Sequence, residues 1–283
     1  MHLDSNVARG SKSAIRTLVL MHTDSNVGFA IAPLESAFCQ IAMELGDDHP
    51  GSVHFAYRSL EKGYPSNLPP GIPVIEFNGA DTLHEPERLL SYVRKHEISF
   101  VLAFDLQPVT ALYAPLRQAG VQCIVSYWGA EISPRKPWWQ RTLKALLLSV
   151  SRSRLDGLIF ESEAMADLAR YGRGVPNSMI DVVPLGIDVS RFSATPTAYV
   201  YEQFAIPRDK RIVVYAGHME PRKGVKTLIE AAVELLATDG RKDVVFLLCG
   251  DRPGERDAFQ SLYHGLGIER DIIFAGYRTD LHL

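Results

Sequence analysis

Short apolar runs alternate with longer amphipathic segments through roughly the first two-thirds of the chain. Short continuous apolar runs are typical of strands buried on both faces, and the segments between them have the spacing of helices. The predicted strands are Ile15–Met21, Val53–Tyr57, Val74–Phe77, Phe100–Phe104, Gln122–Tyr127, Gly157–Phe160 and Ile180–Val183. The predicted helices are Ala30–Leu45, Pro86–His96, Pro108–Ala119, Trp138–Ser151 and Ser162–Tyr171. This alternation predicts βαβ units and a parallel sheet with helices on both faces.

The same alternation starts again after a stretch of weak periodicity, Ser193–Arg211, which contains Pro196 and Pro207. That stretch is typical of a domain connection, so we predict an N-terminal domain of residues 1–194 and a second domain of residues 195–283. The second series contains the predicted strands Ile212–Ala216, Val244–Cys249 and Ile272–Ala275 and the predicted helices Val225–Leu236 and Asp257–Leu266. Doubly wound sheets usually have five or six strands, so the second domain is expected to be incomplete.

Composition narrows the class of protein. The chain has 283 residues, of which 46% are hydrophobic and 22% charged, and its net charge is −3. This is the composition of a globular protein without a concentrated basic face, so no nucleic-acid partner is expected. Its cysteines, Cys39, Cys123 and Cys249, are far apart, which favours reduced thiols over a disulfide framework or a zinc site. The first residues are polar and show no secretory signal, so we expect a cytoplasmic protein.

Common active-site signatures are missing from the sequence. It has no phosphate loop of the G-x-x-x-x-G-K-[ST] type, no G-x-S-x-G elbow and no H-E-x-x-H motif. It also has no D-x-D pair, a motif that holds a divalent cation in some enzymes. No metal site is therefore expected.

Two segments of the first domain are candidate ligand-binding loops. Residues 22–29 (HTDSNVGF) link the first strand to the first helix, where Gly28 would let a ligand approach the backbone and the helix N-terminus would attract an anion. Residues 126–133 (SYWGAEIS) follow a strand, where Trp128 and Glu131 suit the apolar face and the hydroxyls of a sugar. The alternatives are a plain turn for the first segment, and a packed Trp with a capping Glu for the second.

The second domain offers a candidate phosphate site. Residues 214–225 (VYAGHMEPRKGV) place Arg222 and Lys223 between a strand and a helix. Two cations beside helix N–H groups form an anion site that suits a diphosphate. The alternative is a solvated turn.

These segments, taken in order, resemble the family 4, or group 1, glycosyltransferases. The resemblance is carried by VVPLGID…RF from residue 182, GHMEPRKGV from residue 217, and LLCGDRPGER…GYRTDL from residue 247. It implies an α/β protein of the GT-B type, with two Rossmann-like domains facing a cleft, the acceptor on the first and the donor mainly on the second. It also implies transfer from a nucleotide-diphospho-sugar to a glycan, lipid or small-molecule acceptor, with retention at the anomeric carbon and without a metal or other cofactor.

The resemblance assigns roles to individual residues. Lys223 and Arg222 are expected to bind the diphosphate and stabilise its departure, with Gly217, His218 and Gly28 also on the donor side. Asn26, Trp128 and Glu131 are expected on the acceptor side, and Trp128 stands where many members have a histidine.

The sequence also departs from the family pattern. His218 replaces an arginine, and Gly28 stands alone where a pair of glycines is common. The E-x7-E segment is absent before Leu283, so we expect an incomplete donor site and no transfer by this chain alone. The alternatives are a sugar-nucleotide epimerase of the same fold or a non-catalytic fragment.

The first domain also contains a basic, tryptophan-rich segment that begins at Arg135. Within the predicted helix Trp138–Ser151, one face carries Trp139, Leu143, Leu146, Leu147 and Val150. We expect that face to pack on the sheet, as a stripe of this width usually does. The alternative is a peripheral contact with an anionic membrane, because Arg135, Lys136 and Arg152 flank the helix.

Overall fold

The structure is a computed structural model that describes residues 14–27, 31–77, 86–129, 135–186, 189–192, 197–250, 255–278 and 280–281. The chain divides into two compact units, Met1–Ile187 (unit 1) and Asp188–Leu283 (unit 2). Unit 1 contains a seven-stranded sheet and unit 2 a three-stranded sheet, and every strand pairing in both is parallel. The predicted α/β architecture with two Rossmann-like sheets is confirmed.

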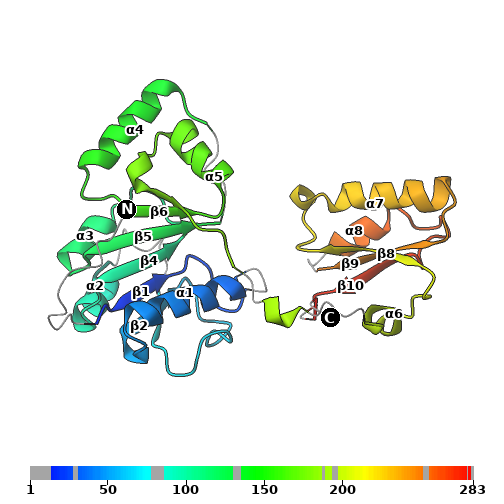
Figure 1. The fold of residues 1–283 in the computed structure, drawn as a ribbon, viewed down its shortest axis with the longest axis horizontal. Coiled ribbons are helices and arrows are strands. Elements are labelled where there is room, and N and C mark those ends of the chain that lie inside the picture. The colour runs from blue at the N-terminus through cyan, green and yellow to red at the C-terminus, as the bar shows by residue number, and fades with distance from the viewer. Residues whose placement is uncertain are drawn as a thin grey trace. The chain divides into compact units, whose positions relative to one another are not determined.

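The sheet of unit 1 has the order β3-β2-β1-β4-β5-β6-β7 (Figure 1). Its strands are β1 (Thr17–Leu20), β2 (Val53–Tyr57), β3 (Val74–Glu76), β4 (Phe100–Phe104), β5 (Cys123–Trp128), β6 (Gly157–Phe160) and β7 (Ile180–Val182). The order reverses between β1 and β4, which makes their carboxyl ends the switch point where ligands of doubly wound sheets bind.

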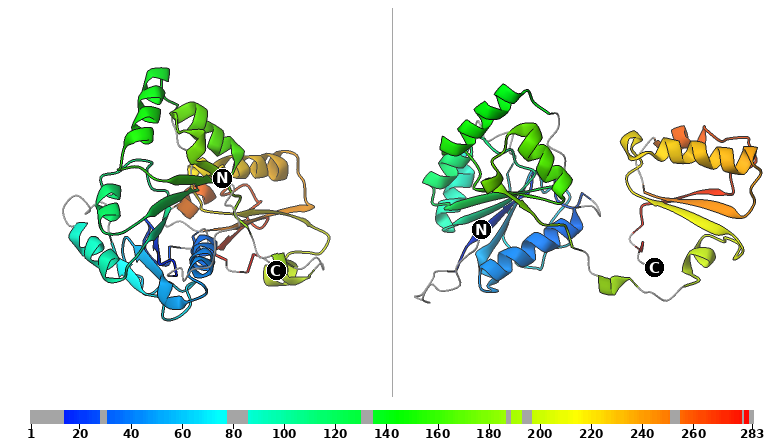
Figure 2. Two further views of the ribbon diagram at one scale, coloured as in Figure 1. Left: turned by 60° about the vertical axis from the view of Figure 1, so that its left-hand side comes forward. Right: turned by 45° about the horizontal axis from the view of Figure 1, so that its top comes forward.

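Alternation along the strands explains why both faces of this sheet are covered. In β1, Leu18 and Leu20 belong to one buried cluster, whereas Val19 belongs to the cluster on the other face. The first cluster packs against α2, α3 and α5, and the second against α1, through residues such as Phe38 (Figures 1 and 2). A strand buried on both faces has a continuous apolar sequence, which is the pattern that predicted it.

The helices of unit 1 lie at the predicted positions, and their bounds differ most from the prediction at α3 and α5. They are α1 (Ala32–Leu45), α2 (Pro86–Lys95), α3 (Tyr113–Gln118), α4 (Trp138–Val150) and α5 (Glu163–Asp167), which continues as the π-helical turn Leu168–Gly172. Helix α3 begins five residues later than its prediction at Pro108, because Val109 forms a β-bridge with Arg154 and Thr110 N–H donates to Ser153 O. These backbone bonds keep the start of the predicted helix extended.

Unit 2 is built around the strand order β10-β9-β8. Its elements are α6 (Tyr199–Gln203), β8 (Arg211–Ala216), α7 (Val225–Val233), β9 (Val244–Cys249), α8 (Glu255–Gln260) and β10 (Ile272–Gly276). Helices α7 and α8 lie on one face of the sheet and α6 on the other (Figure 1). The core joins α7 to β9 and α8, through Val225, Ile229, Phe246 and Phe259.

Helix α6 lies inside the stretch that the sequence predicts to be a domain connection. Its Tyr199 hydroxyl donates to Asp280, and Arg278 bonds both of them. Helix α6 is therefore hydrogen-bonded to Arg278 and Asp280, near the end of unit 2. The sequence pattern does not predict α6, because five residues are too few for helical periodicity to show.

Helix α4 contradicts the expectation that its apolar face packs on the sheet. Trp138 is 71% exposed and Val150 is 72% exposed, and Trp139, Leu143, Leu146 and Leu147 are also exposed. The only fully buried residue of the helix that the structure describes is Leu148, on the opposite side. No helix among the described residues is long and apolar enough to cross a membrane.

Candidate functional site

The carboxyl edge of the unit 1 sheet gathers polar side chains at the switch point. His22 follows β1 and Asp105 follows β4, the strand hydrogen-bonded to β1. The His22 ring stacks on Phe104, with the ring centroids 5.2 Å apart, and its Nδ1 lies 3.0 Å from Phe104 O. These contacts hold His22 over the end of the neighbouring strand.

Asp105 connects this edge to the next strand. Its Oδ1 accepts a hydrogen bond from Gly129 N, just past β5, at 2.9 Å. Asp105 itself has a left-handed backbone with φ of +53°, which Asp tolerates better than most residues. Burial raises the pKa of Asp105, against the opposing effects of the Gly129 N–H and His22.

Glu161, which follows β6, completes the cluster. Burial raises the pKa of Glu161, and the negative charge of Asp105 raises it further. Gly129 lies between the two carboxyl groups, since a Cβ at Gly129 would be 3.3 Å from Glu161 Oε1. The carboxyl edge thus carries a histidine and two carboxyl groups from three strand ends, which can accept hydrogen bonds from sugar hydroxyls and bind a proton.

Neither Asp105 nor Glu161 was found by sequence reasoning. The available signal was that each carboxylate directly follows a predicted strand, at the edge where ligands of open α/β sheets bind. The tryptophan and glycine within residues 126–133 predicted a site in the neighbouring loop instead.

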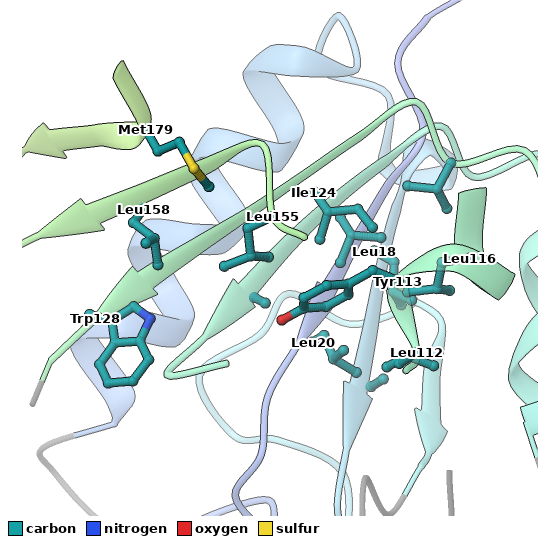
Figure 3. Close-up of a cluster of buried hydrophobic side chains, with 14 of the residues drawn as sticks. Leu18, Leu20, Leu112, Tyr113, Leu116, Ile124, Trp128, Leu155, Leu158 and Met179 are labelled. Atoms are coloured by element: carbon teal, nitrogen blue, oxygen red, sulfur yellow. The ribbon is translucent and has the colours of Figure 1, made fainter. Parts of the chain in front are cut away.

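Trp128 lies in the core, not at the surface of this edge. Its indole is 5% exposed, packs near Phe160 and donates its Nε1–H to Leu106 O at 3.0 Å. Figure 3 shows it among the buried aliphatic side chains of β6 and its neighbours. The structure favours the alternative of a packed tryptophan over the predicted contact with a sugar, because a buried indole cannot offer its face to a ligand.

Asn26 is held by the proline-rich loop that precedes β3. Its Nδ2 donates to Lys62 O at 2.9 Å and Tyr64 O at 3.1 Å, and its Oδ1 accepts from Ser66 N. Asn26 therefore holds this loop in place, and its acceptor-side role stays a prediction. The other two candidates in this unit, Gly28 and Glu131, lie outside the described residues.

The carboxyl edge of the unit 2 sheet is built on glycines. Gly217, Gly250 and Gly276 stand at the ends of β8, β9 and β10, where Gly217 N donates to Cys249 O and Gly250 N donates to Gly276 O. A Cβ at Gly250, whose φ is +152°, would overlap Gly217 O. The missing side chain lets the strand ends approach closely.

The loop after Gly217 carries the predicted phosphate-binding residues. Tyr215 Oη donates to His218 O at 2.8 Å, and Lys223 N donates to Glu220 O, so the loop closes into a 3-10 turn over Pro221–Lys223. Gly224 then takes a left-handed backbone, with φ of +74°, to start α7. No side chain caps this helix within the described part of the chain, which leaves its first N–H groups for an anion.

Arg222 and Lys223 differ in their surroundings. Arg222 Nε lies 2.6 Å from Glu220 Oε2, so its charge is partly balanced. Lys223 is exposed, and no carboxylate among the residues that the structure covers forms an ion pair with it. The candidate anion site therefore consists of Lys223 and the α7 amides, with Arg222 free to join only by leaving Glu220.

A metal centre was not predicted by the sequence. The described ranges contain no group of three or more His, Cys, Asp and Glu side chains placed to hold a metal ion.

Comparison with known proteins identifies the class. Residues 46–186 match the family model described as "Glycosyl transferase 4-like domain", and residues 201–283 match "Glycosyl transferases group 1". Anabaena Alr3699/HepE, solved in complex with UDP, superposes with a TM-score of 0.66 over 94% of this chain and 70% of its own, at 21% identity. That fold is the GT-B fold. The chain belongs to the family 4, or group 1, glycosyltransferases.

Two curated relatives show how much of such a protein the chain represents. It is 28% identical over 118 residues to a D-inositol 3-phosphate glycosyltransferase of Corynebacterium efficiens, which covers 40% of this chain and 28% of the relative. It is 26% identical over 196 residues to a GDP-mannose-dependent alpha-(1-6)-phosphatidylinositol monomannoside mannosyltransferase of Mycolicibacterium smegmatis. This match covers 66% of this chain and 47% of the relative. The matched region thus spans less than half of each relative.

Proposed function

We propose that this protein is a retaining glycosyltransferase that moves a sugar from a nucleotide-diphospho-sugar to a hydroxyl of a glycan, lipid or small molecule in the cytoplasm. The observation that carries the proposal is the loop between β8 and α7. It combines an exposed Lys223 with an uncapped helix N-terminus, directly after a strand of a Rossmann-like sheet. Family membership supplies the reaction class, and this loop supplies the chemistry for the leaving group.

The loop would act on the diphosphate. As the bond from the sugar to the phosphate breaks, negative charge grows on the departing oxygen. Lys223 and the α7 amides would stabilise that charge, and fixed donors of this kind contribute most of the rate in many enzymes. The Anabaena neighbour, solved with UDP, supports a uridine nucleotide as the first donor to test.

The carboxyl edge of unit 1 would bind the acceptor. Asp105 and Glu161 would accept hydrogen bonds from its hydroxyls, and His22 would orient it. In a retaining reaction without a protein nucleophile, the acceptor attacks from the face that the diphosphate leaves. Its proton would then pass to the departing phosphate. We also propose that no metal or cofactor takes part, because Lys223 and the helix amides already supply positive charge at the phosphates.

The identity of the acceptor is supported only as a class. The names of the two relatives include an inositol phosphate and a phosphatidylinositol mannoside. Both are polyhydroxy compounds that carry a phosphate, so a phosphorylated polyol, free or lipid-linked, is the acceptor class that we propose.

Binding of UDP to the 283-residue chain, measured by calorimetry, tests the donor site. Replacing Lys223 by Ala should lower the affinity at least tenfold, because a charge-assisted contact to a phosphate contributes about 1.5–3 kcal/mol. Lys226→Ala is the matched control, since Lys226 lies one turn further along and is paired with Glu230. Equal affinities of the Lys223 variant and the unmodified chain would contradict the assignment.

Transfer itself needs a separate assay. The chain spans 70% of the Anabaena neighbour's length, and we propose that on its own it binds the nucleotide without transferring sugar. Incubation with a panel of nucleotide sugars and polyol phosphates, followed by mass spectrometry, distinguishes a transfer product from an epimer of the donor. Robust transfer would overturn the proposed inactivity but would support the proposed reaction.

A further inference from the structure

Helix α4 leaves a wide apolar surface uncovered in unit 1. The exposed side chains share one side of the helix, which we call the α4 apolar face: Trp138, Trp139, Leu143, Leu146, Leu147 and Val150. The helix is attached from its other side, where Leu148 is buried, Arg141 donates to Tyr171 O, and the Lys136 amide donates to Gly172 O. Figure 2 shows α4 along the outer side of unit 1 in both views.

The segment that contains the α4 apolar face carries charge of one sign. Residues 135–154 contain six Arg and Lys residues and no Asp or Glu. Arg135 and Lys136 are exposed before the helix, and Arg152 is exposed after it. The whole chain has a net charge of −3, so this segment is a local reversal of the overall charge.

The electrostatics of the attached side agree with an excess of positive charge. The pKa of Lys144 is lowered to about 8, first by burial and then by the charges of Arg173 and Lys136. Both of the charges that lower this pKa are positive, which fits the excess of cations in the sequence of this segment.

We propose that the α4 apolar face binds the surface of an anionic lipid bilayer, with the helix lying in the plane of the membrane. Leucine and tryptophan side chains would enter the boundary between headgroups and acyl chains, and the flanking cations would pair with lipid phosphates. An interfacial helix needs this combination of an apolar face, cationic flanks and tryptophan. The apolar area alone would also fit a second protein, but the uniform positive charge favours a lipid surface.

The test uses the 283-residue chain and sedimented vesicles, and it needs no sugar transfer, so it is independent of the proposed function. Vesicles of equal parts phosphatidylglycerol and phosphatidylcholine should bind the chain at least tenfold more tightly than vesicles of phosphatidylcholine alone. Tryptophan emission should shift to shorter wavelength on binding. That shift would come from Trp138 and Trp139, because Trp128 is already buried.

Two pairs of substitutions separate the apolar and the electrostatic contributions. Leu146→Gln with Val150→Gln should weaken binding at least tenfold, while Leu266→Gln, an exposed leucine in unit 2, should not. Lys136→Glu with Arg152→Glu should weaken binding by a similar factor. Lys95→Glu with Lys242→Glu changes the net charge equally at exposed sites elsewhere and should have little effect.

Several results would overturn the proposal. They are the absence of vesicle binding, equal binding to neutral vesicles, and binding that the Leu146 and Val150 substitutions leave unchanged. Sedimentation velocity adds a further one. If the chain is a dimer that these two substitutions dissociate, the α4 apolar face is covered by a second copy and not by lipid.

Discussion

Strands β1 and β8 hold corresponding positions in the sequences of their units but differ in how many neighbouring strands they have and in how deeply they are buried. Each is the first strand of its unit and leads into a proposed ligand-binding loop. Strand β1 lies between β2 and β4, and all four of its residues are buried. Strand β8 pairs only with β9 among the described strands, and Val213 and Val214 are exposed.

The difference extends to the loops. The loop after β1 is fixed by side chains from neighbouring strands and loops: His22 stacks on Phe104, and Asn26 is bonded to the loop before β3. The loop after β8 is held by bonds within its own segment and to β9: Tyr215 Oη donates to His218 O, and Gly217 N donates to Cys249 O. If the proposed donor binds unit 2, its carboxyl edge should gain more order on binding than the edge of unit 1, because β8 has one strand partner among the described strands and β1 has two.

The substitution Gly250→Ala has the largest effect on stability that we predict for either unit. Gly250→Ala would place a methyl group against Gly217 O, so unit 2 should lose about 3 kcal/mol of stability through overpacking and a forced shift of the backbone. Gly240→Ala is the control: Gly240 also has a positive φ, of +67°, but open space around it, so about 1 kcal/mol is expected. Hydrogen exchange followed peptide by peptide should show both losses in unit 2. Equal losses would contradict the close-approach account.

His54 predicts a pH effect that is confined to unit 1. His54 is buried, its Nδ1 lies 2.7 Å from Tyr92 Oη, and burial lowers its pKa from 6.5 to about 4. Between these pH values the unfolded chain binds more protons than the folded one, so stability is lost as pH falls from about 6.5 to 4. The loss should reach about 3 kcal/mol at the acidic end, since one pKa unit corresponds to about 1.4 kcal/mol.

The three tryptophans all lie in unit 1, so urea unfolding followed by tryptophan emission measures that unit selectively. His54→Gln should reduce the pH dependence between 6.5 and 4. A variant that keeps the full slope would show that another group causes it.

Two substitutions of Asp105 separate its bond to the Gly129 N–H from its negative charge. Asp105→Asn keeps an oxygen for the Gly129 N–H and tolerates the positive φ, so the stability of unit 1 should change by less than about 0.5 kcal/mol. Asp105→Ala loses both and should cost about 2 kcal/mol. If the carboxylate binds the acceptor, the Asn variant should still weaken acceptor binding. Equal stability losses in the two variants would exclude the positioning role.

The strands were the most predictable part of the molecule. The bounds of β2, β4, β6 and β9 are those predicted from their apolar runs, because a strand buried on both faces leaves a short continuous signal. Helix α4 shows the limit of such patterns. Its periodicity correctly identified an apolar face, but periodicity does not show whether a face has a partner, and this face is exposed.

The candidate site was less predictable than the fold. The loop with Lys223 follows a strand and precedes a helix as predicted. Tryptophan suits both sugar binding and core packing, so the sequence left both roles of Trp128 open, and only the tertiary structure shows its indole bonded to Leu106 O. Asp105 and Glu161 come together from strands far apart in the sequence, and single carboxylates after strands are too common to be recognised alone.

Amide exchange with and without UDP tests the central claim most directly. Without UDP, the amides of β1 should exchange at least a hundredfold more slowly than those of β8, because β1 opens only when the core of unit 1 opens. Adding UDP should slow exchange in residues 217–226 and in β8 and leave β1 unchanged. Equal protection of β1 and β8 without ligand, or UDP protection that misses residues 217–226, would contradict the account.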